Sequence, residues 1–182
     1  MLRDAIAAHE SHAQALILLF ARLADIVSTR LASPRLVLEA NPVVRSLGWP
    51  FAWATLAVCG IAYLPERGPS LALSASVLSL FVAAGNLSRG WAMRAIGEEA
   101  YRAHMRRVLA AAKPAQVYLA IAAASALVGS AGALLLVLEP DPDGAAWSFA
   151  MGILLYAGAT WFHSSVAVRR MLREAAHATP RP

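Results

Sequence analysis

The chain has 182 residues, of which 59% are hydrophobic and only 15% are charged, and its mean hydropathy is +0.55. Soluble domains have about a quarter of their residues charged, so this composition excludes an ordinary soluble protein and indicates a membrane protein. The net charge of +5 does not indicate a nucleic-acid partner, because the basic residues lie between apolar runs rather than on a polar domain.

Apolar runs of about 19 residues predict five transmembrane helices. We expect them at about residues 13–33, 49–64, 70–91, 115–138 and 146–168. The second is short, because an α-helix of this length reaches only about 24 Å across an apolar bilayer core of about 30 Å. We find no internal repeat and no separate soluble segment, so residues 1–182 are expected to form one all-α integral membrane domain.

The basic residues predict the orientation, because cytoplasmic loops of membrane proteins are enriched in Lys and Arg. Residues 30–45 contain three of them, residues 89–113 contain six and the tail 169–182 contains four, which together is thirteen of the sixteen. With five spans all three stretches lie on one side of the membrane, whereas four spans would divide them. We therefore expect a multi-pass protein of the inner (cytoplasmic) membrane with its N-terminus outside and its C-terminus inside.

Polar residues recur in the cytoplasmic half of three predicted spans. Helical spacing puts Arg22, Asp25 and Thr29 on one face of the first span. A charge inside a membrane is expected to face protein or water and to be paired, so Arg22 and Asp25 either neutralise each other structurally or serve a site. The polar cluster that we predict also includes loop and helix residues further along the chain: Glu39, Asn41, Asn86, Arg89, Tyr156, Thr160 and His163.

This polar cluster predicts a pocket open to the cytoplasm, and the loop with Glu39 and Asn41 forms its roof. Each residue also has an ordinary structural role, since a Thr bonds its own helix and a terminal Arg extends to the membrane surface. Asn41 before Pro42 is expected to cap a short helix. The sequence contains no metal-binding spacing and no catalytic or nucleotide-binding motif, so we expect no metal and no cofactor.

Residues 92–113 predict an amphipathic helix at the cytoplasmic surface, between spans three and four. We expect Arg102, Arg106 and Arg107 to contact anionic lipid headgroups; a solvated connector is the alternative. The fourth span has small residues at helical spacing, which is typical of a close helix-packing face within the chain or against another subunit. These residues are Ser125, Gly129, Gly132 and Ala133.

The run from Asp25 through Thr29 to "EANP", followed by Arg45 and an apolar span, resembles a group of small multi-pass prokaryotic membrane proteins classed as a domain of unknown function. In that group the first helix has an aspartate and a threonine, and the next loop reads E-x-N-P. The resemblance covers residues 14–64 and implies that Asp25, Thr29, Glu39, Asn41 and Pro42 are the characteristic positions. It implies no activity.

Two classes of function are compatible with these features. The first, which we favour, is a small non-enzymatic membrane protein, either an accessory subunit of a membrane complex or a carrier of protons or a small ion that uses the polar cluster. The second is a membrane enzyme acting on a lipid or prenyl headgroup at the cytoplasmic face. The expected partners are membrane lipids and, in the first class, other membrane subunits or further copies of the chain.

Overall fold

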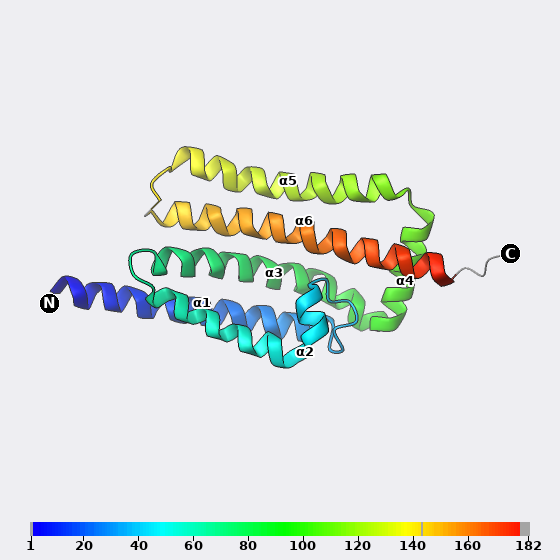
Figure 1. Ribbon diagram of the computed structural model, residues 1–182, viewed down its shortest axis with the longest axis horizontal. Coiled ribbons are helices and arrows are strands. Elements are labelled where there is room, and N and C mark those ends of the chain that lie inside the picture. Colours follow the sequence, from blue (N-terminus) through cyan, green and yellow to red (C-terminus); the bar gives the residue numbers. More distant parts are fainter. Residues whose placement is uncertain (1, 143, 179–182) are drawn as a thin grey trace.

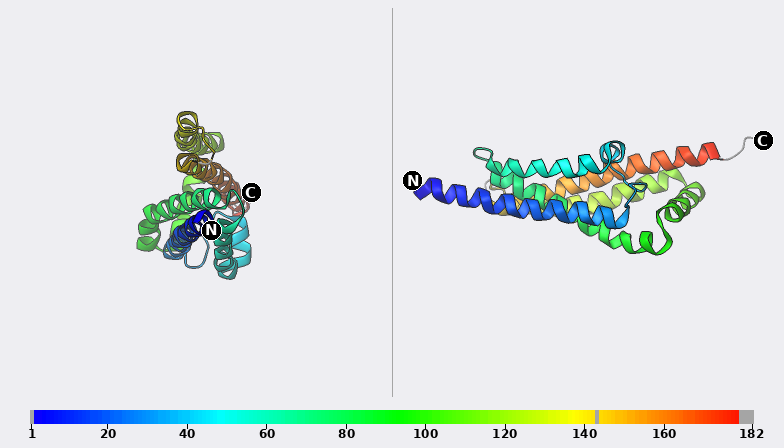
Figure 2. Two further views of the ribbon diagram at one scale, coloured as in Figure 1. Left: turned by 90° about the vertical axis from the view of Figure 1, so that its left-hand side faces the viewer. Right: turned by 90° about the horizontal axis from the view of Figure 1, so that it is seen from below.

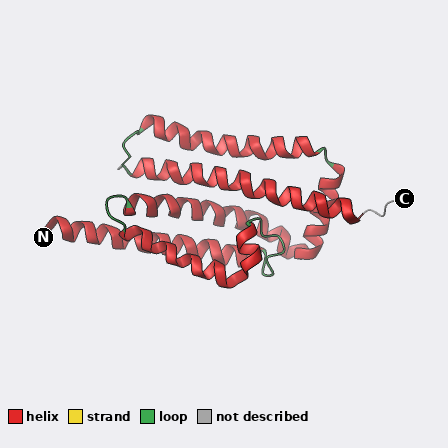
Figure 3. Ribbon diagram, in the orientation of Figure 1, coloured by secondary structure: helices red, strands yellow, loops and turns green. Residues whose placement is uncertain are grey.

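The structure is a computed structural model that describes residues 2–142 and 144–178, and within these residues it is helical with short loops (Figure 3). The described part of the chain forms six α-helices and one 3-10 helix: α1 (Leu2–Ala32), α2 (Pro42–Ala54), η1 (Thr55–Tyr63), α3 (Gly68–Ile96), α4 (Glu98–Ala111), α5 (Pro114–Leu138) and α6 (Ala145–Ala178). The predicted all-α class is confirmed.

The long helices lie side by side in the order α5, α6, α3 and α1, and η1 packs against both α1 and α3 (Figures 1 and 2). Helix α4 crosses the bundle at one end, where it contacts α3 and α6. The loop 33–41 and the last turns of α6 lie at the same end (Figure 1). The three basic stretches of the sequence therefore meet at one end of the bundle, which we call the basic end.

Four helical segments are long and apolar enough to cross a membrane: Pro42–Tyr63, Gly68–Ile96, Pro114–Leu138 and Ala145–Glu174. Three of them cover the predicted spans at 70–91, 115–138 and 146–168, and the fourth is longer than the predicted span at 49–64. The predicted first span at 13–33 lies in α1, which is not among these four, so the number of five spans is not confirmed. These four helices indicate a membrane protein. The predicted helix between spans three and four is also present, as α4, which Gly97 separates from α3 with a φ of 85° that favours glycine.

The second apolar segment bends near its start. Gly48 has a φ of 73° and interrupts α2, and beyond it the chain runs along the bundle as the end of α2 and the nine residues of η1. A 3-10 helix rises about 2.0 Å per residue against about 1.5 Å in an α-helix. Residues 49–63 therefore extend about 27 Å rather than about 22 Å, which brings the short predicted span close to the apolar core thickness of about 30 Å.

Two hydrogen bonds attach the ends of η1 to α1. Arg22 Nη2 donates to Thr55 Oγ1 at 2.6 Å, and Tyr63 Oη lies 2.9 Å from His12 Nδ1. The ten residue steps from His12 to Arg22 span about 15 Å in an α-helix. The eight steps from Thr55 to Tyr63 span about 16 Å in a 3-10 helix but only about 12 Å in an α-helix. The 3-10 geometry thus matches the spacing of the two contacts on α1.

Small residues allow α3, α6 and α5 to pack closely. Ser74 Oγ of α3 donates to the Ser148 carbonyl of α6 at 2.8 Å. A Cβ at Gly152 would lie 2.5 Å from Val77 Cβ, so α6 approaches α3 too closely there for any side chain.

The predicted small-residue face of α5 lies against α6. Ser125 and Gly132 are buried, and Cβ atoms built at Gly129 and Gly132 would lie 3.6 Å from Ala157 Cβ and 2.9 Å from the Ala150 carbonyl oxygen. Ala133 is exposed and does not belong to this face. The predicted contact is therefore within the chain, and it is made through Gly132.

Candidate functional site

A cavity of about 340 Å³ lies between α1, the loop 33–41, α2, α3 and α6. We call it the central cavity. All ten members of the predicted polar cluster line it, although they come from segments far apart in the sequence: Arg22, Asp25, Thr29, Glu39, Asn41, Asn86, Arg89, Tyr156, Thr160 and His163. Its volume is within the usual range of small-ligand sites.

On the α1 side of the cavity Arg22 and Asp25 form an ion pair, with Arg22 Nη1 2.6 Å from Asp25 Oδ2. The same guanidinium also donates to Thr55 Oγ1 at 2.6 Å and to Ser79 Oγ at 3.4 Å. Arg22 therefore links three helical segments, η1, α1 and α3. Pairing and hydrogen bonding together compensate the loss of hydration of the two charges.

Asn86 extends this network across α1 and α3. Its Nδ2 donates to Thr29 Oγ1 at 2.8 Å and to Ser28 Oγ at 3.4 Å, while Thr29 Oγ1 lies 3.5 Å from Asp25 Oδ1. An amide can donate two hydrogen bonds, and a hydroxyl can accept and donate at once. The predicted residues Asp25, Thr29 and Asn86 thus form a connected polar wall.

The loop 33–41 covers the cavity at the basic end. Asn41 Oδ1 accepts from the backbone N–H groups of Val43 at 3.0 Å and Val44 at 3.5 Å, so the predicted helix cap with Pro42 in the first turn is confirmed. The Glu39 carboxylate accepts from Asn41 N–H at 2.7 Å. Burial is the main reason why the pKa of Glu39 is raised, and the nearby charge of Asp25 raises it further.

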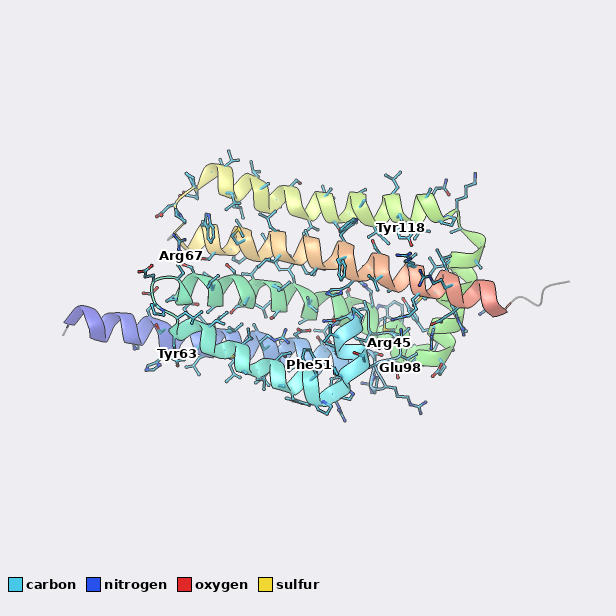
Figure 4. All side chains as sticks on the ribbon, viewed as in Figure 1. Arg45, Phe51, Tyr63, Arg67, Glu98 and Tyr118 are labelled. Atoms are coloured by element: carbon cyan, nitrogen blue, oxygen red, sulfur yellow. The ribbon has the colours of Figure 1, made fainter. Side chains whose placement is uncertain are left out.

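Contacts outside the cavity hold this loop in place. Glu98 at the start of α4 accepts hydrogen bonds from the Ser33 hydroxyl and from the Arg35 backbone N–H. Trp49 Nε1 donates to the Pro34 carbonyl at 2.9 Å, and the Arg30 guanidinium lies 5.1 Å from the centre of the Trp49 ring. The roof of the cavity is therefore attached to α2 through Trp49 and to α4 through Glu98, which is labelled in Figure 4.

The opposite side of the cavity has polar groups without partners among the described residues. Nδ1 of His163 is buried and makes no hydrogen bond. Arg89 makes no ion pair with any described carboxylate, and it approaches Tyr156 across Gly85, where a Cβ would lie 3.5 Å from the tyrosine hydroxyl and 3.7 Å from Arg89 Nη2. Donors and a titratable ring thus face a space large enough for a small solute.

Sequence reasoning missed Thr55 and Ser79, which accept hydrogen bonds from Arg22. Both lie in apolar segments, and a Ser or Thr there does not by itself indicate a polar partner, because its hydroxyl can bond the carbonyls of its own helix. Arg22 could have indicated that such partners exist. A membrane arginine has five hydrogen-bond donors, and one carboxylate cannot accept from all of them.

The three arginines predicted to contact headgroups lie in different environments. Arg102 Nη2 forms an ion pair with Glu174 of α6, at 2.8 Å and 2.7 Å from the two carboxylate oxygens. Arg106 is half-buried and Arg107 is exposed. Arg102 is therefore a contact between α4 and α6, and Arg107 is the exposed member of the predicted set.

Among residues 2–142 and 144–178, no group of three His, Cys, Asp or Glu side chains is arranged to hold a metal ion. The chemistry that the central cavity can offer is hydrogen bonding, charge pairing and proton exchange at Glu39 and His163.

Comparison with known proteins gives no relative: the chain matches no protein-family model, no curated protein and no solved structure.

Proposed function

We propose that the protein is a membrane carrier of protons or a small ion, and that the central cavity is its binding site. In this proposal Glu39 and His163 exchange protons, and Arg89 with Tyr156 binds the small ion where that ion is an anion. The Arg22–Asp25 pair and the Asn86–Thr29 bond build the wall that positions these groups.

The observation that supports a carrier is the division of the cavity into a bonded wall and an unbonded wall. Arg22, Asp25, Thr29 and Asn86 are bonded to one another, with only Nε of Arg22 left without a partner among these bonded groups, whereas the ring of His163 is buried at Nδ1 and makes no hydrogen bond there to any described residue. A buried polar atom without a partner is unfavourable, and it indicates a function or an unseen ligand. Ionisable groups inside a membrane domain are typical of ion and proton pathways.

The proposed topology has five spans, with α1 as the first. Its N-terminus lies outside the inner membrane and its C-terminus in the cytoplasm. The meeting of the three basic stretches at the basic end supports this arrangement (Figure 1). The central cavity then lies in the cytoplasmic half of the membrane.

The carrier proposal is tested with purified protein in liposomes that contain a pH-sensitive dye. A potassium gradient with valinomycin imposes a membrane potential, and proton entry is followed by fluorescence. We expect the wild-type protein to admit protons well above the rate of empty liposomes. Glu39→Gln and His163→Ala are expected to lower that rate at least tenfold.

Glu66→Gln is the matched control, because Glu66 lies in the loop at the opposite end of the bundle; it should transport like the wild type. Proton entry no faster than in empty liposomes, across a series of added monovalent ions, would reject the carrier. Stable co-purification with other membrane subunits would then favour the accessory-subunit alternative, and turnover of an added lipid would favour the enzyme.

A further inference from the structure

A second group of charged residues lies outside the central cavity, on the last turns of α6 at the basic end. A groove of about 380 Å³ runs along this part of the helix and is lined by Val166, Arg169, Arg170, Arg173 and Glu174. Arg102 of α4 reaches the same place through its ion pair with Glu174, and the charge of Arg45 of α2 acts on Arg170. We call these residues the arginine groove.

The arginine groove has more positive charge than its carboxylates can neutralise. Glu174 is shared between Arg102, at 2.7 Å, and Arg170, whose Nε lies 4.0 Å from the carboxylate. The other contact of Arg170 is from Nη1 to the Glu39 carbonyl oxygen at 3.4 Å. The group therefore contains five arginines, of which Arg102 and Arg170 share Glu174, while the charge of Glu39 acts on Arg170.

Donors in this group are buried without acceptors. Three guanidinium nitrogens have no hydrogen-bond partner although water does not reach them: Nε of Arg102 and both Nε and Nη2 of Arg170. Buried donors and like charges in one place are unfavourable unless an anion binds there. The part of the chain that the structure describes supplies no further carboxylate at this point, so the missing acceptor is expected to come from a ligand.

Phosphate has the chemistry that fits such a site. Its several oxygens accept from more than one guanidinium at once, and the planar fork of Arg matches phosphate bidentately. The aliphatic stems of the arginines and Val166 supply an apolar surface beside the charges. The groove is at a helix end, where a transmembrane helix meets the headgroup layer.

We propose that the arginine groove binds a phosphate-bearing anion, with Arg170 and Arg102 as its principal ligands. The phosphate is supplied either by an anionic lipid headgroup or by a soluble phosphate. Glu39 is shared with the central cavity, but neither Arg170 nor Arg102 lines that cavity, so anion binding is measured separately from transport.

The test measures binding to the purified protein in a zwitterionic detergent. One arm adds phosphatidylglycerol and, for comparison, phosphatidylcholine, and counts retained lipids by native mass spectrometry. The other arm adds inorganic phosphate, with sodium chloride at equal ionic strength as reference, and measures the thermal midpoint. A preference for phosphatidylglycerol supports a lipid ligand, and a specific rise of the midpoint with phosphate supports a soluble one.

The variants identify the residues. Arg170→Gln is expected to weaken binding at least tenfold, and Arg169→Gln, which removes an exposed groove residue, should weaken it severalfold even if Arg170→Gln fails to fold. Arg94→Gln is the matched control, because Arg94 is an exposed arginine in the last turn of α3 at the same end and lies outside the groove; its binding should stay within twofold of the wild type. Glu174→Gln should bind more tightly, because the competing carboxylate is gone.

Two results would overturn the proposal. One is that neither phosphatidylglycerol nor phosphate has any effect beyond its reference compound. The other is that Arg94→Gln loses as much binding as Arg169→Gln, which would indicate nonspecific attraction to the basic end.

Discussion

The Arg22–Asp25 pair allows a quantitative test of the polar wall. In Asp25→Asn the arginine keeps its charge, because a guanidinium does not lose its proton in a protein, but it loses the partner at 2.6 Å. Breaking a buried ion pair costs about 3–5 kcal/mol. The side chains here are 19% and 13% exposed, and Arg22 keeps the hydroxyls of Thr55 and Ser79, so we expect the lower value of about 2–3 kcal/mol.

The reverse change should cost less. In Arg22→Leu the orphaned Asp25 can take up a proton and become neutral, and its hydrogen bond with Thr29 can persist. The double change Arg22→Leu with Asp25→Leu removes both charges, and we expect its stability within about 1 kcal/mol of the wild type. The double variant should therefore be the most stable of the three, Arg22→Leu should be less stable, and Asp25→Asn should be the least stable.

Thermal unfolding in detergent measures this order. For a chain of this size about 1 kcal/mol corresponds to about 2–4 °C, so Asp25→Asn should lower the midpoint by about 4–12 °C. A midpoint equal to that of the wild type would refute the reasoning, because the pair would then not compensate a desolvated charge. A double variant that is both stable and fully active in proton transport would remove Asp25 from the proposed site.

Three further predictions concern topology, packing and pH. A reporter fused after Pro182 should be cytoplasmic and one fused before Met1 periplasmic in a fusion assay; both on one side would exclude five spans. Gly152→Ala should destabilise the protein by about 2 kcal/mol or more, because the added methyl group would be overpacked against Val77. Gly158→Ala is the control, since no atom lies within 4 Å of a Cβ there, and its thermal midpoint should be unchanged or slightly higher. Equal effects of the two changes would reject the close α3–α6 contact. The pKa of Glu39 is raised in the folded protein, so the stability contributed by its protonated form is complete below the ordinary pKa of 4.5 and is lost as pH rises through the raised pKa. The thermal midpoint of Glu39→Gln should therefore exceed the midpoint of the wild type by a margin that grows from pH 4 to 8. A margin that stays constant with pH would contradict the raised pKa.

The helices could be predicted from the sequence because their signals are strong and local. Apolar runs bounded by Pro114 and by the turn after Glu139 leave little choice of helix ends. The helix in 92–113 was predictable from its periodicity, and Asn41 from its position before Pro42. The 3-10 geometry of η1 was not, because "TLAVCGIAY" is compatible with an ordinary α-helix and only the contacts with α1 distinguish the two.

The membership of the central cavity was predicted from depth alone. In the predicted topology the first, third and fifth spans run in the same direction, and Asp25, Asn86 and His163 all lie toward the same end of these spans, so they were expected at one level. Their division into bonded and unbonded groups could not be predicted, because hydrogen bonding depends on distances of a few tenths of an ångström between segments. The ion pair of Arg102 with Glu174 was missed for the same reason, since 72 positions separate the two residues.

The 3-10 helix η1 also sets how many residues this segment can contain. Its ends are attached to His12 and Arg22, about 15 Å apart along α1, and at about 1.5 Å per residue an α-helix would need ten residue steps to cover that distance, two more than the chain provides. Insertion of two residues between Thr55 and Tyr63 should therefore be absorbed by conversion to an ordinary α-helix with both attachments intact. Deletion of two residues has no such solution, because the remaining six steps reach only about 12 Å even as a 3-10 helix, and no hydrogen-bonded helix is more extended, so one attachment would be lost.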